Sequence, residues 1–328
     1  MHTDGDNRAG GVASPVRLPV LRPRAVPRPR VIATLILVQA LFGTLPLAGQ
    51  LVMRWVPPVG TAALRATGAA IVFALLVRRR LASVALRDVP LLLLFSVLAI
   101  IGNQILFLEG LSRTSQINAS VLITTIPVFT VGFALALRRE TASLARLGGV
   151  AVGLCGALLL ARVEHFHLGN RGVLGNLMVV ANCSLWSLYL VLARPVLRRI
   201  PPLVMTAWLF LIGAVVMAPL GLPSAVDGLA RAPLEGWLAA AWVVIFPTIV
   251  AYLLNTWALR EAESSQVAIF TYLQPVVAGI LAWAFAGETL DLRTGIAAAL
   301  IFVGVALVQV DGLPSQGKKP QMNTDEHR

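Results

Sequence analysis

Polar and aromatic side chains recur at helical spacing inside long apolar segments of this sequence. Gln39, Gly43, Pro46 and Gln50 follow one another at i, i+4, i+7 and i+11, so they share one helical face. Amides donate and accept hydrogen bonds, and aromatic rings add apolar surface with a polar handle. This combination favours a cavity that binds an amphipathic molecule, although the same groups can join helices without any ligand. The candidate binding residues are Gln39, Asn103, Gln104, Asn182, Trp186, Tyr189, Tyr252, Asn255, Tyr272 and Gln274.

Groups that perform catalysis are missing from these segments. No Asp lies in the middle of an apolar segment. Each cysteine lies within such a segment, where a thiol usually serves as a small apolar group. Enzymes need a group that handles protons or binds a metal. The sequence therefore predicts no catalytic residue, metal site or cofactor, which argues against an integral membrane enzyme. The histidines, lysines and cysteines of the chain, which could otherwise serve in catalysis or metal binding, are His2, His165, His167 and His327, Lys318 and Lys319, and Cys155 and Cys183.

Two charged residues lie within or at the end of an apolar segment, where a charge is costly. Arg65 is deep inside its segment, and Glu109 is near the outer end of the next one. Arg65 could attract a substrate carboxylate or pair with Glu109; alternatively it extends toward the membrane surface or has a structural partner. Since guanidinium stays charged, proton coupling, if present, would depend on Glu109.

Four prolines interrupt apolar segments that are otherwise suited to helices: Pro46, Pro127, Pro247 and Pro275. A proline inside a helix removes one backbone hydrogen bond and frees a carbonyl one turn earlier. In lipid such a carbonyl needs a partner, which a water-filled cavity can supply. These prolines are candidates for bending during gating, and the alternative is a fixed kink that only shapes packing.

The apolar segments that hold these residues are long enough to cross a membrane. The chain is 57% hydrophobic and 13% charged, with mean hydropathy +0.81, which is typical of an integral membrane protein. A helix needs about 20 apolar residues to span the hydrocarbon core. The sequence predicts an all-α fold of ten transmembrane helices, approximately at 31–53, 58–77, 89–110, 115–137, 145–162, 173–193, 203–222, 236–258, 264–285 and 293–311.

The positive charge is distributed unevenly over the predicted loops. If the N-terminus is cytoplasmic, 20 of the 27 Lys and Arg residues lie on the cytoplasmic side. Cytoplasmic loops collect such residues during insertion, so the net charge of +12 does not indicate a nucleic-acid partner. We expect an inner-membrane protein with both termini in the cytoplasm. The basic tail 1–30 and the tail 312–328 are expected to be disordered.

The chain contains a duplication. Pro127 is matched by Pro275, and Glu140 is matched by Glu288 at the same separation. The pair Pro57-Pro58 also has a match, Pro201-Pro202. The repeats cover 31–162 and 173–311, with five predicted helices in each. Because five is odd, the second repeat is inverted relative to the first. Inverted repeats are a common construction of secondary transporters.

These motifs resemble the EamA-type branch of the drug/metabolite transporter superfamily. The resemblance rests on the spacing P-x12-E-T in both halves, on "PPVGTAALR" at 57–65 and on "WSLYLVL" at 186–192. It implies a ten-helix inverted-repeat carrier that moves small metabolites, often amino acids, outward across the cytoplasmic membrane. This sequence has Phe42 where tryptophan is frequent in the family, which puts residue roles in the first helix in doubt.

Segments 145–162 and 293–311 hold hardly any polar groups. The first carries Gly148, Gly149, Gly153 and Gly156, a pattern that favours close backbone packing, so we expect a scaffold or a homodimer face. The functional expectation is an alternating-access exporter of amino acids or related amphipathic compounds. The alternative is a lipid or nucleotide-sugar translocator of the same superfamily, for which a larger basic pocket would be expected.

Overall fold

The structure, a computed structural model, describes residues 28–78, 80–81, 84–114, 116–141, 143–160, 170–286 and 292–310. Within these ranges every regular element is a helix, so the all-α prediction is confirmed for the described part of the chain. The predicted tails, apart from residues 28–30, lie outside the described residues, as does Glu288 of the duplicated motif.

The apolar segments predicted in the first half are helical. The first is divided at Thr44, and the fourth is divided just before Pro127. A short 3-10 turn at Leu86–Asp88 precedes the third, and a π-helical stretch at Val97–Ile101 lies within it. The α-helices are α1 (Pro29–Gly43), α2 (Leu45–Val52), α3 (Pro58–Val77), α4 (Val89–Ser96), α5 (Gly102–Arg113), α6 (Gln116–Ile123), α7 (Ile126–Ala136) and α8 (Leu144–Leu160).

The second half has a similar order of helices. A π-helical stretch, Ile245–Val250, again lies within one long helix, and a 3-10 stretch, Ile269–Tyr272, precedes Pro275. The α-helices are α9 (Asn170–Val196), α10 (Pro202–Ala230), α11 (Leu234–Val244), α12 (Ala251–Glu261), α13 (Ser264–Ala268), α14 (Leu273–Ala286) and α15 (Leu292–Val310). Both α3 and α10 begin at the second proline of a duplicated Pro-Pro pair, since proline suits the first helical position.

Several of these helices can cross a membrane. Six helical stretches in the described residues are long and apolar enough, and three more are apolar but shorter. The protein is therefore a multi-pass helical membrane protein, while the count of ten spans remains a prediction. The six are Pro29–Val52, Pro58–Val77, Leu86–Arg113, Gly172–Val196, Pro202–Ala230 and Leu234–Glu261; the shorter ones are Val121–Ala136, Leu144–Gly156 and Gly295–Gln309.

Each predicted kink proline lies where helix geometry changes. Pro46 and Pro127 are in the first turns of α2 and α7, Pro247 lies in a π stretch, and Pro275 follows a 3-10 stretch. The Ser187 hydroxyl of α9 lies 3.0 Å from the Ile126 carbonyl, beside Pro127, and 2.7 Å from the carbonyl of Cys183 in its own helix. The helix interruptions are thus present, and a role in gating remains a prediction.

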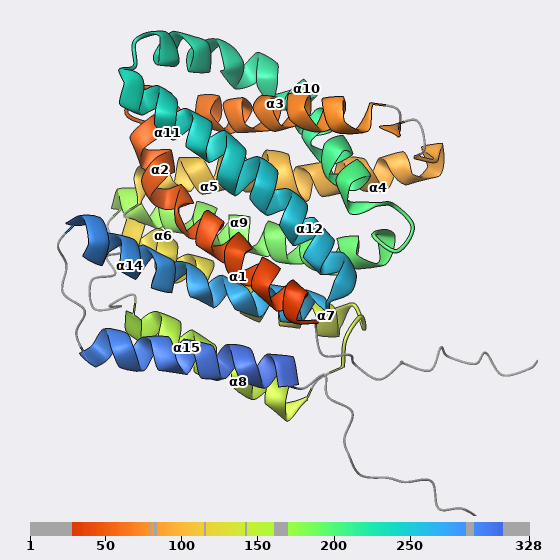
Figure 1. The fold of residues 1–328 in the computed structure, drawn as a ribbon, viewed down its shortest axis with the longest axis vertical. Helices are drawn as coiled ribbons and strands as arrows, with labels where there is room; N and C mark the ends of the chain where they lie inside the picture. The colour runs from red at the N-terminus through yellow and green to blue at the C-terminus, as the bar shows by residue number, and fades with distance from the viewer. Residues whose placement is uncertain are drawn as a thin grey trace, which may run out of the picture.

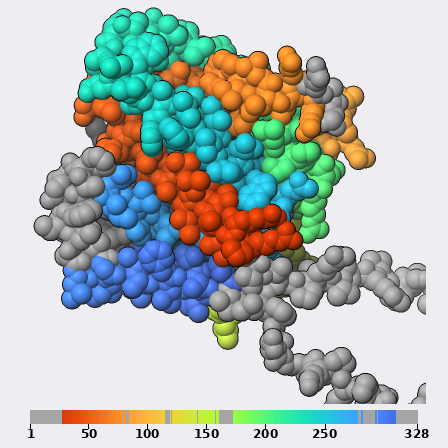
Figure 2. All heavy atoms as spheres, viewed as in Figure 1, coloured from red at the N-terminus to blue at the C-terminus, as the bar shows by residue number. Residues whose placement is uncertain are grey.

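The helices of the two halves interleave. In Figure 1, α3 packs on α10 at one end of the molecule and α8 packs on α15 at the other. Between these pairs, α1 contacts α12 and α14, and α9 contacts α5 and α7. Figure 2 shows α1 (red) at the surface between α12 (cyan) and α14 (blue). Every one of these contacts joins an element of the first half to an element of the second, so the two halves enclose a common interior.

Glycines allow α8 and α15 to lie very close together. A Cβ atom on Gly304 would lie 2.5 Å from the backbone nitrogen of Gly153 and 2.7 Å from the carbonyl oxygen of Gly149. Similarly, a Cβ on Gly156 would lie 2.8 Å from the Ala297 carbonyl oxygen. Three glycines of the stripe predicted as a scaffold or dimer face, Gly149, Gly153 and Gly156, are therefore packed inside the molecule, whereas a Cβ on Gly148 would meet nothing within 4 Å. A homodimer through these helices would have to use their outer faces.

Candidate functional site

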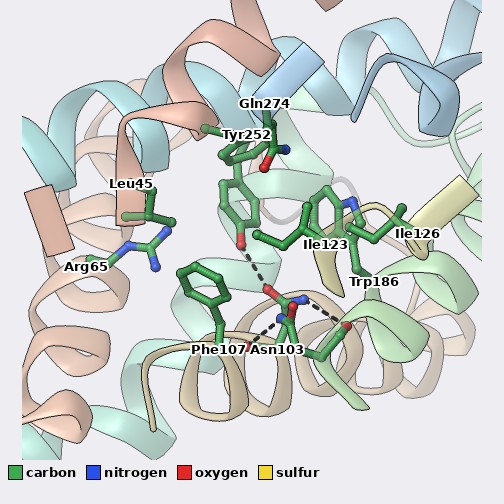
Figure 3. Close-up of a pocket in the computed structure, with 11 residues that line it drawn as sticks. Leu45, Arg65, Asn103, Phe107, Ile123, Ile126, Trp186, Tyr252 and Gln274 are labelled. Carbon is green, nitrogen blue, oxygen red and sulfur yellow. Dashed lines mark hydrogen bonds between the residues drawn. The ribbon is translucent and has the colours of Figure 1, made fainter. Parts of the chain in front are cut away.

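A small cavity of about 70 Å³ lies between the two halves of the molecule. Its lining combines one cation, three amides and a set of aromatic and aliphatic side chains (Figure 3). Six of the predicted residues are among them: Arg65, Asn103, Asn182, Trp186, Tyr252 and Gln274. The remaining lining residues are Phe42, Leu45, Phe107, Ile123 and Ile126.

Paired amides connect α5 to α9 at one side of the cavity. The Asn182 side-chain nitrogen donates to the Asn103 carbonyl at 2.8 Å, and the Asn103 side-chain nitrogen lies 3.4 Å from the Asn182 carbonyl. The Tyr252 hydroxyl adds a third helix, because it lies 3.1 Å from the Ala99 carbonyl and 3.4 Å from Asn103 Oδ1. These bonds give the polar side of the cavity a fixed shape, as the dashed lines in Figure 3 show.

A second amide pair connects α1 to α14. The Gln274 side-chain nitrogen donates to Gln39 Oε1 at 2.7 Å. Gln39 is 3% exposed and reaches the cavity only through this contact, whereas Gln274 lines the cavity. Both amide pairs thus join one repeat to the other.

Arg65 extends from the middle of α3 toward the cavity (Figure 3). Its Nε donates to the Thr248 hydroxyl at 2.8 Å, and that hydroxyl in turn donates to the Val243 carbonyl at 2.6 Å. The π stretch of the second half positions this threonine, so an irregular helix of one repeat orients the arginine of the other. The Arg65 side chain is buried, with 1% exposure.

Aromatic rings form the apolar side of the cavity. Trp186 lies 5.4 Å from Tyr252 and 6.1 Å from Phe42, measured between ring centroids, and both pairs have edge-on geometry. Phe42 also meets Tyr252 edge-on, at 5.6 Å. Edge-on contacts between aromatic rings are favourable, and each contact restrains the two rings that it joins. The cavity therefore offers a preformed aromatic surface beside the amides.

Other predicted residues are buried near the cavity without lining it. Tyr189 stacks on Trp186 with centroids 5.2 Å apart, and its hydroxyl lies 3.4 Å from the Thr256 hydroxyl. Gln104 and Asn255 are each 1% exposed. The Gln104 amide has no hydrogen bond of normal geometry, although it lies close enough to the Tyr252 hydroxyl to interact with it electrostatically.

Two residues among the predicted site candidates, Tyr272 and Glu109, make their contacts away from the cavity. The Tyr272 hydroxyl donates to the Val150 carbonyl of α8 at 3.0 Å, and its ring packs against Gly153, so it attaches the α8–α15 pair to the rest of the molecule. Glu109 pairs with Arg113, one helical turn later in α5. The predicted alternative in which Glu109 pairs with Arg65 is not realised.

Sequence reasoning missed the apolar part of the lining. Phe107 follows Asn103 at i+4 on the same helical face, which is a signal that the sequence does contain. Phe42 was noted only as a departure from a family pattern. The other three are aliphatic residues in apolar segments, and nothing in their residue type separates a cavity-lining position from a lipid-facing one.

A buried ion cluster lies outside the cavity, where α7, α8 and α13 meet. Arg146 pairs with Glu140 at 2.7 Å and with Glu263 at 2.6 Å. Glu140 also accepts a hydrogen bond from the backbone nitrogen of Ser265. The cluster connects the end of the first repeat to the start of α13 in the second.

Taken with the fold, this site defines a class of protein: a helical membrane protein with a small polar and aromatic cavity between its two halves. Within the described residues no group of His, Cys, Asp and Glu is placed to hold a metal ion. A sequence model of the EamA-like transporter family matches residues 30–162 and again 173–310. The chain belongs to the EamA-like transporter family, part of the drug/metabolite transporter superfamily.

Curated relatives are consistent with this assignment. The chain is 28% identical over 218 residues to an uncharacterized transporter of Archaeoglobus fulgidus, covering 65% of this chain and 74% of the relative. It is 27% identical to a WAT1-related protein of Arabidopsis thaliana, covering 67% and 65%. It is also 27% identical to a probable terminal-alkyne amino-acid exporter of Streptantibioticus cattleyicolor, covering 68% and 73%.

One solved crystal structure has the same fold. It aligns with a TM-score of 0.68 at 22% identity and covers 85% of this chain and 96% of the other. The architecture is therefore one that another chain adopts in a crystal. At this identity the likeness concerns the fold alone.

Proposed function

We propose that this protein is a secondary transporter that exports amino acids or related amphipathic compounds by alternating access. The observation that carries the proposal is the cavity enclosed between the two halves, with amides, aromatic rings and one arginine in its lining. Buried polar groups inside a membrane protein typically mark a substrate pathway. The name of the relative from Streptantibioticus cattleyicolor, a probable amino-acid exporter, supports the same substrate class.

The duplicated construction supports the mechanism. The family model matches the chain twice. The contact of α1 with α12 has its equivalent, with the two repeats exchanged, in the contact of α9 with α5. In our proposal the two repeats are inverted in an inner cell membrane, with both termini cytoplasmic. Exchanging the conformations of the repeats would then move the cavity opening from one side to the other. A homodimer through the outer faces of α8 and α15 is compatible with this arrangement.

A lipid or nucleotide-sugar translocator is the alternative within the same superfamily. Such cargo carries phosphate groups, for which several cationic side chains would be expected around a large pocket. The cavity has about 70 Å³ and one cation, Arg65. A single cation suits cargo that carries one carboxylate better than cargo that carries several phosphate charges.

The proposal is tested by transport into proteoliposomes against a panel of radiolabelled amino acids and their derivatives. Trp186→Ala removes one wall of the cavity, so we expect at least a tenfold loss of transport rate at unchanged expression. The matched control is Trp237→Ala on α11, because that tryptophan is 52% exposed on the outer surface. Equal transport by both variants and the wild type would remove the cavity from the transport path.

A further inference from the structure

Arg65 is a fully buried cation that has no carboxylate partner among the described residues. Its side chain is 1% exposed in the middle of α3. The carboxylates that form ion pairs in the described part of the chain do so with other arginines: Glu109 with Arg113, Glu140 and Glu263 with Arg146, and Asp88 with Arg199. Its Nε donates to the neutral Thr248 hydroxyl, and the neutral Tyr252 hydroxyl also lies close enough to interact with the guanidinium.

A guanidinium in this position is costly when the protein is empty. Removing a charge from water is costly, and the neutral hydroxyls of Thr248 and Tyr252 offset only part of that cost. The ten other residues that line the cavity are all uncharged. The lining therefore has a net charge of one positive unit, and an anion inside the cavity would balance it.

The orientation of Arg65 suits a carboxylate. Because Thr248 holds Nε, the terminal nitrogens of the guanidinium are directed toward the cavity (Figure 3). This end of arginine matches the two oxygens of a carboxylate in a bidentate pair. The rings of Phe42, Trp186 and Tyr252 lie on the same cavity and can receive the apolar body of the same molecule.

We propose that Arg65 binds the carboxylate of the transported molecule, so that the substrate class is organic carboxylates with an apolar or aromatic body. This inference rests on the proposed transport function. It also implies that an amine without a carboxylate is excluded, because the lining holds no acidic group to pair with its ammonium and Arg65 repels it. The carboxylate, and not the amino group, is then the feature that the site selects.

The test uses compounds that share one ring and differ in charge. Radiolabelled L-phenylalanine, phenylacetate and phenethylamine are offered separately to proteoliposomes that contain the full chain. We expect the two carboxylates to be transported at least about tenfold faster than the amine at equal concentration, as a charge-assisted hydrogen-bonded pair can provide. This comparison needs only the wild-type protein, so it does not depend on the folding of any variant.

Variants then assign the preference to Arg65. Arg65→Gln should lose the tenfold preference, and Arg65→Lys should retain part of it, since lysine keeps the charge but not the bidentate geometry. Arg54→Gln removes an exposed arginine elsewhere and should behave as the wild type does. The unfolding midpoint of each variant in detergent checks that the comparison is between folded proteins.

Each outcome separates the two proposals. Transport of phenethylamine at the rate of the carboxylates, or an unchanged preference in Arg65→Gln, would overturn the carboxylate assignment and leave the transport function standing. A rate that depends on chloride without distinguishing carboxylate from amine would assign the anion to chloride instead, and would also overturn it. Absence of transport for every compound, including the amino-acid panel, would reject the transport function itself.

Discussion

At the scale of single residues, the structure distinguishes a buried ion cluster from an exposed pair. Arg146 and Glu140 are each 1% exposed at their side chains, whereas in the pair of Arg113 with Glu109 the side chains are 41% and 18% exposed. Removing Arg146 would leave the buried Glu140 and the partly buried Glu263 without their shared cation. Removing Arg113 takes away a pair that water already screens. The two arginines therefore have different effects on stability although both form ion pairs.

We predict that Arg146→Met lowers the free energy of unfolding by about 3–5 kcal/mol, the cost of breaking a buried pair from one side. The matched variant Arg113→Met should cost about 1 kcal/mol or less. Unfolding of both variants in the same detergent, followed by tryptophan fluorescence, gives the comparison. If the two variants lost stability equally, burial of the Arg146 cluster would not be what makes it stabilising.

At the scale of elements, irregular helices recur in equivalent places of the two repeats. The π stretches Val97–Ile101 and Ile245–Val250 are separated by the same number of residues as Pro127 and Pro275. Each supplies a polar contact of the cavity: the first offers the Ala99 carbonyl to Tyr252, and the second positions Thr248 beside Arg65. Such bulges are frequently found at functional sites. They present backbone and side-chain groups that a regular helix would direct elsewhere.

The packing of α8 on α15 gives a prediction at the same scale. Gly304→Ala would place a methyl group 2.5 Å from the backbone of Gly153, where no flexible side chain can yield. The helices must separate, and we expect a loss of about 1–3 kcal/mol. Gly295→Ala on the same helix meets nothing within 4 Å and should be neutral or slightly stabilising, since alanine favours helix. Thermal unfolding of both variants in detergent is the measurement; equal midpoints would contradict the close contact.

At the scale of the whole molecule, the distribution of Lys and Arg predicts the orientation of the chain in its membrane. Single cysteines introduced as Pro15→Cys and Leu168→Cys, in a background that lacks Cys155 and Cys183, test it with a membrane-impermeant maleimide on intact cells. Position 168 should be labelled and position 15 should be protected. Labelling of position 15 alone would reverse the orientation and with it the proposed direction of export.

The sequence by itself determined the class of this protein. Apolar segments of membrane-spanning length and polar stripes at helical spacing are local patterns, and the duplication of Pro127 as Pro275 needs only the order of residues. These patterns correctly indicated a helical membrane protein of the transporter family, and they predicted the helix interruptions at the four prolines. They also indicated six of the eleven residues that line the cavity, because a polar group inside hydrocarbon is costly enough to stand out against its neighbours.

Only the tertiary structure decided which of these groups meet. The sequence could not choose between Glu109 and other partners for Arg65, because that choice depends on how α3 packs relative to α5 and to the π stretch that holds Thr248. It could not tell that Tyr272 is directed toward α8 while Tyr252 is directed toward the cavity. Nor could it select Leu45, Ile123 and Ile126 from other aliphatic residues. A helical pattern fixes the face on which a side chain lies, but only the packing of distant helices determines whether that face meets lipid, another helix or a cavity.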